Sequence, residues 1–173
     1  MERFPDDVRY ELIRGELCPM PPPGAEHGSI TARLSSRVTI YIEDNELGEC
    51  FAAETRFVIE QNPDTVLAPD FAFISKERLP AKLPKGFLRI APDIVLETRS
   101  PGDTKREVSL KVARWLQAGA KIVWVIDPET RTLTVHRSGM VPRILGLEDM
   151  LTGEEVLPGF TLPIRRLFRD AEG

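Results

Sequence analysis

Two apolar, strand-like runs in the middle of the chain each contain one carboxylate where a core strand would be hydrophobic. Asp70 lies within the run Val66–Ile74, and Glu97 lies near the end of the run Pro92–Arg99. An acid in such a run loses its hydration unless a partner compensates for that loss. A divalent cation bound by carboxylate oxygens is one such partner. Any fold of this chain must therefore satisfy both acids, and a shared metal ion would do so.

The bulk composition indicates an ordinary globular protein. The chain has 173 residues, of which 42% are hydrophobic and 29% are charged, and this predicts a single domain over residues 1–173. No apolar run approaches the roughly 20 residues of a membrane helix, and the N-terminus shows no signal peptide. We therefore expect a cytoplasmic protein with no membrane association. The two cysteines, Cys18 and Cys50, are too few for a disulfide framework.

The net charge of −4 argues mildly against a nucleic-acid-binding protein, because contacts to phosphates need a basic surface. The argument is weak, since a nuclease needs positive potential only along its cleft. A bound metal ion would also neutralise part of the acidity. Net charge therefore leaves nucleic-acid binding open.

The spacing of apolar residues predicts two helices among several strands. One helix is expected from about Ala25 to Asn45 and a second over residues 105–118, because both segments place apolar residues three and four apart. The expected strands are Cys50–Ile59, Val66–Ser75, Ile94–Arg99, Lys121–Ile126 and Thr132–Arg137, with a hairpin over Tyr10–Met20 in front and shorter segments from Ile144. This order predicts an α+β (α/β-like) fold with a mixed central sheet flanked by helices.

The order αβββαβ, with Asp70 on the second core strand and Glu97 on the third, resembles the PD-(D/E)XK nuclease superfamily. Pro69-Asp70 matches the PD, and Glu97-Thr98-Arg99 stands at the (D/E)XK position. More specifically, the chain resembles the Uma family of restriction endonucleases. The segments with this resemblance are Tyr10–Leu17, Met20–His27, Ala68–Asp70, Ala91–Glu97, Ser100-Pro101 and Gly119–Pro128. The resemblance implies a restriction-endonuclease-like core with an added N-terminal hairpin and C-terminal strands.

The resemblance also implies a metal site and a reaction. Asp70 and Glu97 would bind Mg²⁺, or Mn²⁺ in its place, and the metal would assist hydrolysis of a phosphodiester bond in DNA. An acid from the first helix often joins the metal site in this superfamily, and Glu26 is the candidate here. His27 matches a histidine of the family motif and could shuttle a proton or orient a ligand, because its pKa lies near neutrality.

The catalytic cation has two candidates. The superfamily usually places lysine two residues after the second acid, where this chain has Arg99, and arginine is a poor proton-transfer group. In the Uma family, by this resemblance, the corresponding lysine is located on the following helix, and Lys111 stands at that position. We prefer Lys111 over Arg99. Glu11 and Glu16 are weaker site candidates, because alternating acids in an edge hairpin usually face solvent.

The leading interpretation is thus a metal-dependent DNA endonuclease. The alternative is a catalytically inactive relative that acts as a nucleic-acid-binding or protein-interaction module, which Arg99 and the negative net charge would suit. A third interpretation keeps the metal but replaces DNA by RNA or a smaller phosphodiester. Many nucleases cut both strands as symmetric dimers, so a homodimer is expected on family grounds alone.

Overall fold

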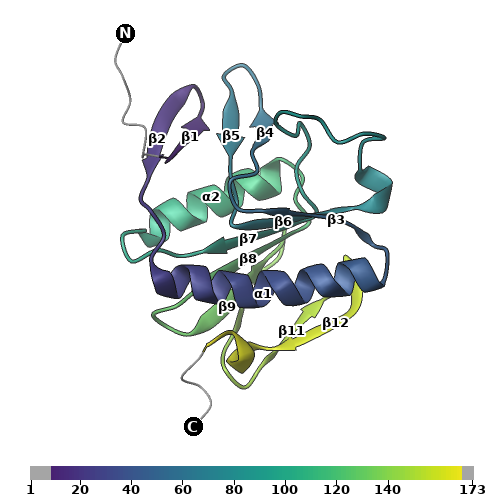
Figure 1. Cartoon of the computed structure of the whole chain (residues 1–173). Coiled ribbons are helices and arrows are strands. Elements are labelled where there is room, and N and C mark those ends of the chain that lie inside the picture. The colour runs from purple at the N-terminus through teal and green to yellow at the C-terminus, as the bar shows by residue number, and fades with distance from the viewer. Residues whose placement is uncertain (1–8, 169–173) are drawn as a thin grey trace.

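The computed structural model describes residues 9–168, which form two α-helices and three β-sheets (Figure 1). The helices are α1 (Ala25–Asp44) and α2 (Lys105–Gln117), and short 3₁₀ turns occur at η1 (Lys76–Arg78) and η2 (Ile164–Leu167). The strands are β1 (Arg9–Ile13), β2 (Glu16–Met20), β3 (Gly48–Ala52), β4 (Phe57–Glu60), β5 (Thr65–Leu67), β6 (Phe71–Ser75), β7 (Ile94–Thr98), β8 (Ile122–Asp127), β9 (Thr132–His136), β10 (Arg143–Leu145), β11 (Met150–Gly153) and β12 (Leu157–Pro163). No helix in this part of the chain is long and apolar enough to cross a membrane.

The central sheet has six strands in the order β10-β9-β8-β7-β6-β3. Only β7 and β8 are parallel, and α2 connects them, because a parallel pair needs a crossover segment between its strands. The other neighbouring pairs are antiparallel. The predicted α+β class and the mixed central sheet flanked by helices are therefore confirmed.

The two helices cover opposite faces of this sheet (Figure 1). Side chains alternate between the faces of each strand, so the apolar residues of β6 and β7 divide between two cores. On one face α1 buries Ile30, Leu34, Val38 and Ile42 against the sheet and the C-terminal strands β11 and β12. On the other face α2 buries Val112 and Trp115. Glu97 projects toward the second core, because it follows Val95 by two residues on β7.

The structure corrects two strand predictions. The run Val66–Ser75 is not one strand but two, β5 and β6, which belong to different sheets. Pro69 lies between them, and proline cannot donate a hydrogen bond to a strand ladder. The run Cys50–Ile59 divides in the same way into β3 and β4, around Glu54 with its positive φ of 73°.

This division creates a second sheet of four strands in the order β2-β1-β5-β4. The predicted N-terminal hairpin is confirmed as β1 and β2, and Leu12 of β1 pairs with Val66 of β5. The hairpin is therefore attached to the strand that precedes Asp70. This long-range pairing positions β1 beside the segment that contains the first candidate acid.

Asp93 is a fully buried acid directly before β7. Its Oδ1 lies 2.8 Å from Lys121 Nζ and 2.9 Å from Arg78 Nη1, and its Oδ2 accepts a hydrogen bond of 2.7 Å from the backbone N–H of Ser75. Burial opposes ionisation, but these three donors outweigh it and lower the pKa of Asp93. The acid thus ties the end of β6 to the starts of β7 and β8.

We predict that Asp93→Asn lowers the free energy of unfolding by about 2 kcal/mol at pH 7, because it leaves two cations without their shared carboxylate. The pKa of Asp93 is lower in the folded protein than in the unfolded chain. The carboxylate therefore adds to the free energy of unfolding above the unfolded pKa of about 4, and this contribution is lost as pH falls below that value. Urea unfolding from pH 7 down to pH 3 should show that the free energies of unfolding of wild type and Asp93→Asn become more similar as pH falls.

Lys121→Met is the matched control, because this side chain is 49% exposed and its loss leaves Arg78 beside Asp93. It should cost less stability than Asp93→Asn. Equal stability of wild type and Asp93→Asn at pH 7 would contradict the role given to Asp93.

Candidate active site

Asp70 lies in the short segment between β5 and β6 and is fixed to the end of β7. Its backbone N–H donates to the carbonyl of Leu96 at 3.1 Å, and its Oδ2 accepts a hydrogen bond of 2.6 Å from the backbone N–H of Thr98. His27 Nε2 approaches the same oxygen at 3.2 Å. Both partners use Oδ2, so Oδ1 makes no hydrogen bond within residues 9–168. One oxygen of Asp70 is thus left to accept a further ligand.

Glu97 on β7 has both of its oxygens engaged by α2. Its Oε1 accepts a hydrogen bond of 2.8 Å from Trp115 Nε1, and its Oε2 lies 3.0 Å from Lys111 Nζ. Lys111 and Trp115 are four residues apart and therefore share one face of the helix. Burial raises the pKa of Glu97 to about 8, Lys111 opposes the rise, and the nearby charges of Asp70 and Glu11 add to it.

Glu11 of β1 is a member of the site that sequence reasoning ranked too low. The side chain is only 7% exposed, its Oε1 lies 2.9 Å from Lys111 Nζ, and the same oxygen accepts a hydrogen bond of 3.1 Å from the backbone N–H of Ala68. The expectation that it faces solvent was wrong, because β1 lies between β2 and β5 and is not an edge strand. Glu16 of β2 is exposed, as expected.

Lys111 joins the two buried acids. Its ammonium group lies within 3.0 Å of both Glu11 and Glu97. Burial alone would lower the pKa of Lys111, but the two carboxylates outweigh it and raise that pKa. The side chain therefore remains positively charged across the physiological pH range.

His27 in the first turn of α1 points toward Asp70. It is 9% exposed, and its Nδ1 is buried with no hydrogen-bond partner among the described residues. Burial opposes charging of the ring, but the hydrogen bond to Asp70 and the charge of Asp70 together raise the pKa of His27. Glu26 precedes it, is exposed, and makes no ion pair within residues 9–168. Because successive helical residues point about 100° apart, the structure brings His27 but not Glu26 to the pair.

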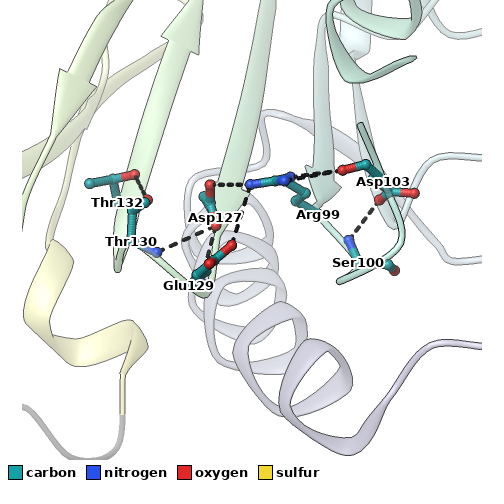
Figure 2. A network of polar contacts seen from close by, with 7 residues as sticks. All are labelled: Arg99, Ser100, Asp103, Asp127, Glu129, Thr130 and Thr132. Atoms are coloured by element: carbon teal, nitrogen blue, oxygen red, sulfur yellow. Dashed lines mark hydrogen bonds and ion pairs between the residues drawn. The ribbon is translucent and has the colours of Figure 1, made fainter. Parts of the chain in front are cut away.

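Arg99 belongs to a separate network of polar contacts, with Asp127 and Asp103 among its members (Figure 2). Its Nη1 is 2.8 Å from Asp127 Oδ2 at the end of β8, and its Nε and Nη2 donate to the backbone carbonyl of Asp103 at 3.2 and 3.1 Å. These acceptors raise the pKa of Arg99. Arg99 follows β7 directly, and its side chain contacts Asp127 and Asp103, not the α2 residues that contact Glu97.

The contacts of Arg99 connect the segment that enters α2 to the central sheet. In Figure 2 the guanidinium group lies between the end of β8 and the turn from Ser100 to Asp103. This turn is closed by a hydrogen bond of 2.6 Å from the backbone N–H of Ser100 to Asp103 Oδ2. The next residue, Thr104, caps α2 through a reciprocal pair of hydrogen bonds with Glu107. Arg99 therefore helps to place the helix that contains Lys111.

The donor set of the cluster suits a hard divalent cation. Asp70, Glu97 and Glu11 supply carboxylate oxygens, the ligand type that Mg²⁺ and Mn²⁺ prefer. Within residues 9–168, no group of three or more acidic, histidine or cysteine side chains is placed so that it could hold a metal ion. Magnesium commonly retains several waters and needs only one or two carboxylates. The unengaged oxygen of Asp70 fits such a site.

Comparisons with known proteins give the family. A family model for Uma2, described as "Putative restriction endonuclease", matches residues 1–165. The chain belongs to the Uma2 family. No curated protein matches the sequence.

A solved structure agrees with the fold of this Uma2-family chain. It is a crystal structure at 1.96 Å resolution described as a "putative nuclease belonging to DUF820" from Anabaena variabilis. The similarity covers 92% of this chain and 89% of that chain, with a TM-score of 0.82 and 24% sequence identity. The similarity shows that the α+β fold of this chain is shared with that structure.

We predict that Glu97→Gln makes the free energy of unfolding less sensitive to pH. The folded-state pKa of Glu97 is raised to about 8, so between about pH 4.5 and 8 the folded protein binds more protons than the unfolded chain. Wild-type stability should therefore fall as pH rises through this interval, by about 2 kcal/mol more than in the variant. Urea unfolding at pH 5 and pH 8, in the presence of EDTA, measures the difference.

Glu16→Gln, which changes an exposed acid of the same type, should follow the wild-type dependence. Parallel behaviour of wild type and Glu97→Gln between the two pH values would mean that Glu97 does not ionise in this range.

Proposed function

We propose that this protein is a magnesium-dependent endonuclease that hydrolyses phosphodiester bonds in DNA. The observation that supports this most strongly is that Asp70, directly before β6, is hydrogen-bonded to Thr98 next to Glu97 on β7, and that Lys111 contacts Glu97. The family description and the description of the similar solved structure point to the same class of reaction.

Asp70 and Glu97 would hold the metal through their carboxylate oxygens, with Mg²⁺ as the expected ion and Mn²⁺ as a substitute. When bound, the ion would supply a lower pKa for an attacking water and neutralise charge on the scissile phosphate. Asp70 is suited to this role because its Oδ2 is fixed by Thr98 and His27, so that the direction of its other oxygen is set in advance.

Lys111 would stabilise negative charge on the phosphate in the transition state. Because the neighbouring acids raise its pKa, the ammonium group is a poor proton donor or acceptor near neutrality and acts through its charge. Glu11 would hold this ammonium group beside Glu97. In this proposal Arg99 is a positioning residue, since its contacts lie with Asp127 and Asp103.

A specific observation also supports the alternative of an inactive binding module. The ammonium group of Lys111 already pairs with two of the three acids, which reduces their capacity to bind a cation. Titration calorimetry with Mn²⁺ separates the two functions. Binding by wild type that is lost in Asp70→Asn and in Glu97→Gln supports the enzyme, whereas no binding by wild type supports the inactive module.

The proposed function predicts that the purified protein nicks supercoiled plasmid DNA when Mg²⁺ or Mn²⁺ is present. Asp70→Asn, Glu97→Gln and Lys111→Met should each lower the rate at least about 100-fold, because the first two remove a metal-binding carboxylate and the third removes the cation at the phosphate. Arg99→Lys should retain activity within about tenfold, since its contacts lie outside the cluster. Gel separation of nicked and linear plasmid measures all five proteins.

Glu43→Gln, an exposed acid near the end of α1, is the control and should cut like wild type. A parallel assay with RNA of the same sequence tests the choice of DNA. Unchanged cleavage of plasmid DNA by Asp70→Asn would contradict the proposed endonuclease function.

A further inference from the structure

The connection between β6 and β7 concentrates positive charge in an acidic protein. Residues 76–89, here called the basic loop, contain five of the 23 lysines and arginines and one of the 27 acids of the chain. The chain as a whole has a net charge of −4. The five cations are Lys76, Arg78, Lys82, Lys85 and Arg89. Such local clustering marks a surface that attracts anions despite the overall charge.

Most of these cations are exposed and are not used inside the fold. Arg78 is the exception, because it pairs with the buried Asp93. Lys82, Lys85 and Arg89 are exposed and make no ion pair with any residue between 9 and 168. Structural stability therefore does not account for these three side chains.

An exposed aromatic ring lies among the cations. Phe87 is 51% exposed, and the guanidinium carbon of Arg56 lies 5.7 Å from the centre of its ring. Arg56 is also exposed, so it adds a further positive charge to the same surface. Proteins that bind single strands combine cations with an accessible aromatic ring, and exposed cations alone bind the phosphates of a duplex without reading its sequence.

The basic loop is attached to the strand that leads toward the proposed active site. Leu88 pairs with Phe57 of β4, through a hydrogen bond of 2.7 Å from Val58 N–H to the carbonyl of Leu88. Phe57 pairs in turn with Leu67 of β5, which precedes Asp70 by three residues. In Figure 1 the loop is the teal coil beside β4.

This connectivity limits the distance between the two surfaces. Neighbouring strands lie about 5 Å apart, and three extended residues span at most about 11 Å. The attached end of the loop is therefore within roughly 20 Å of Asp70. Each nucleotide of a DNA strand rises about 3.4 Å, so this separation corresponds to about six nucleotides.

We propose that the basic loop, together with Arg56, binds the phosphodiester backbone of a nucleic acid several nucleotides away from the phosphate at Asp70 and Glu97. The proposal rests on the function proposed above, because it concerns the same substrate. Lysine acts at phosphates as a point charge and carries no sequence information there. The loop would thus supply affinity and orientation, while the cluster of Asp70, Glu97 and Lys111 supplies the reaction.

The test compares wild type with Lys82→Gln/Lys85→Gln/Arg89→Gln by fluorescence anisotropy with a labelled 20-base-pair duplex, in EDTA and over a range of NaCl concentrations. We expect the triple variant to bind at least about tenfold more weakly at 100 mM NaCl. The slope of log K against log[NaCl] should become shallower by about 2 to 3, because each lost phosphate contact removes about 0.9.

The control is Arg143→Gln/Arg165→Gln/Arg166→Gln, which lowers the net charge equally on the C-terminal strands and their flanking turn. It should bind DNA with the wild-type slope. If both triple variants lose the same affinity, the effect is net charge alone and the proposal is overturned. Wild-type DNA affinity in the loop variant overturns the proposal as well. A parallel measurement uses phosphatidylserine vesicles. If the loop variant loses binding to these vesicles but keeps wild-type DNA affinity, the loop binds a lipid surface and the proposal is overturned.

A small substrate separates this proposal from the proposed function. Bis(p-nitrophenyl) phosphate is too small to reach the loop from the cleft, so its hydrolysis should be unchanged in the loop variant while cleavage of a long duplex falls. If wild type cuts nothing but the loop variant still loses DNA binding selectively, the proposed function fails and the loop proposal stands. If wild type cuts DNA and the loop variant cuts and binds it equally well, the loop proposal fails alone.

Discussion

The ion pair between Glu97 and Lys111 is the contact on which the arrangement of the site depends. A carboxylate beneath α2 is costly to bury, and the ammonium group together with Trp115 Nε1 offsets that cost. Because both donors come from α2, the pair also fixes this helix over β7. Glu11 reaches the same ammonium group from a different sheet. One lysine therefore joins the central sheet, the helix that covers it and the N-terminal hairpin.

Charge in this molecule is distributed unevenly, and the distribution agrees with the proposed chemistry. The cluster contains three acids and one lysine, and Lys111 contacts only Glu11 and Glu97. Burial together with this surplus of negative charge raises the pKa of Glu97. A divalent cation would relieve the surplus, and a phosphate group would then be attracted to the metal. Outside this cluster, the basic loop carries a concentration of positive charge. A protein of negative net charge can thus offer a polyanion two separate points of attachment.

Periodicity was enough to predict the two helices and the order of the core. The expectation that Asp70 lies on the second core strand was wrong, because Asp70 stands in the segment between β5 and β6, directly before Phe71. Periodicity and motif spacing failed where the outcome depends on contacts distant in the sequence. The burial of Glu11 follows from the pairing of β1 with β5, which no local pattern encodes. The position of Arg99 depends on its contact with Asp127. Pro69 lies between β5 and β6. Because proline cannot donate a hydrogen bond to a strand ladder, its position in the sequence already indicated that the run Val66–Ser75 would divide into two strands.

The most direct test of the account is a crystal structure of the protein soaked with Mn²⁺, with anomalous difference density collected to locate the ion. The account predicts one strong peak between β6 and β7, with oxygens of Asp70 and Glu97 within about 2.3 Å of the ion and waters in its remaining positions. A saturating soak that shows no peak at this pair, or a peak held only by other residues, would contradict it.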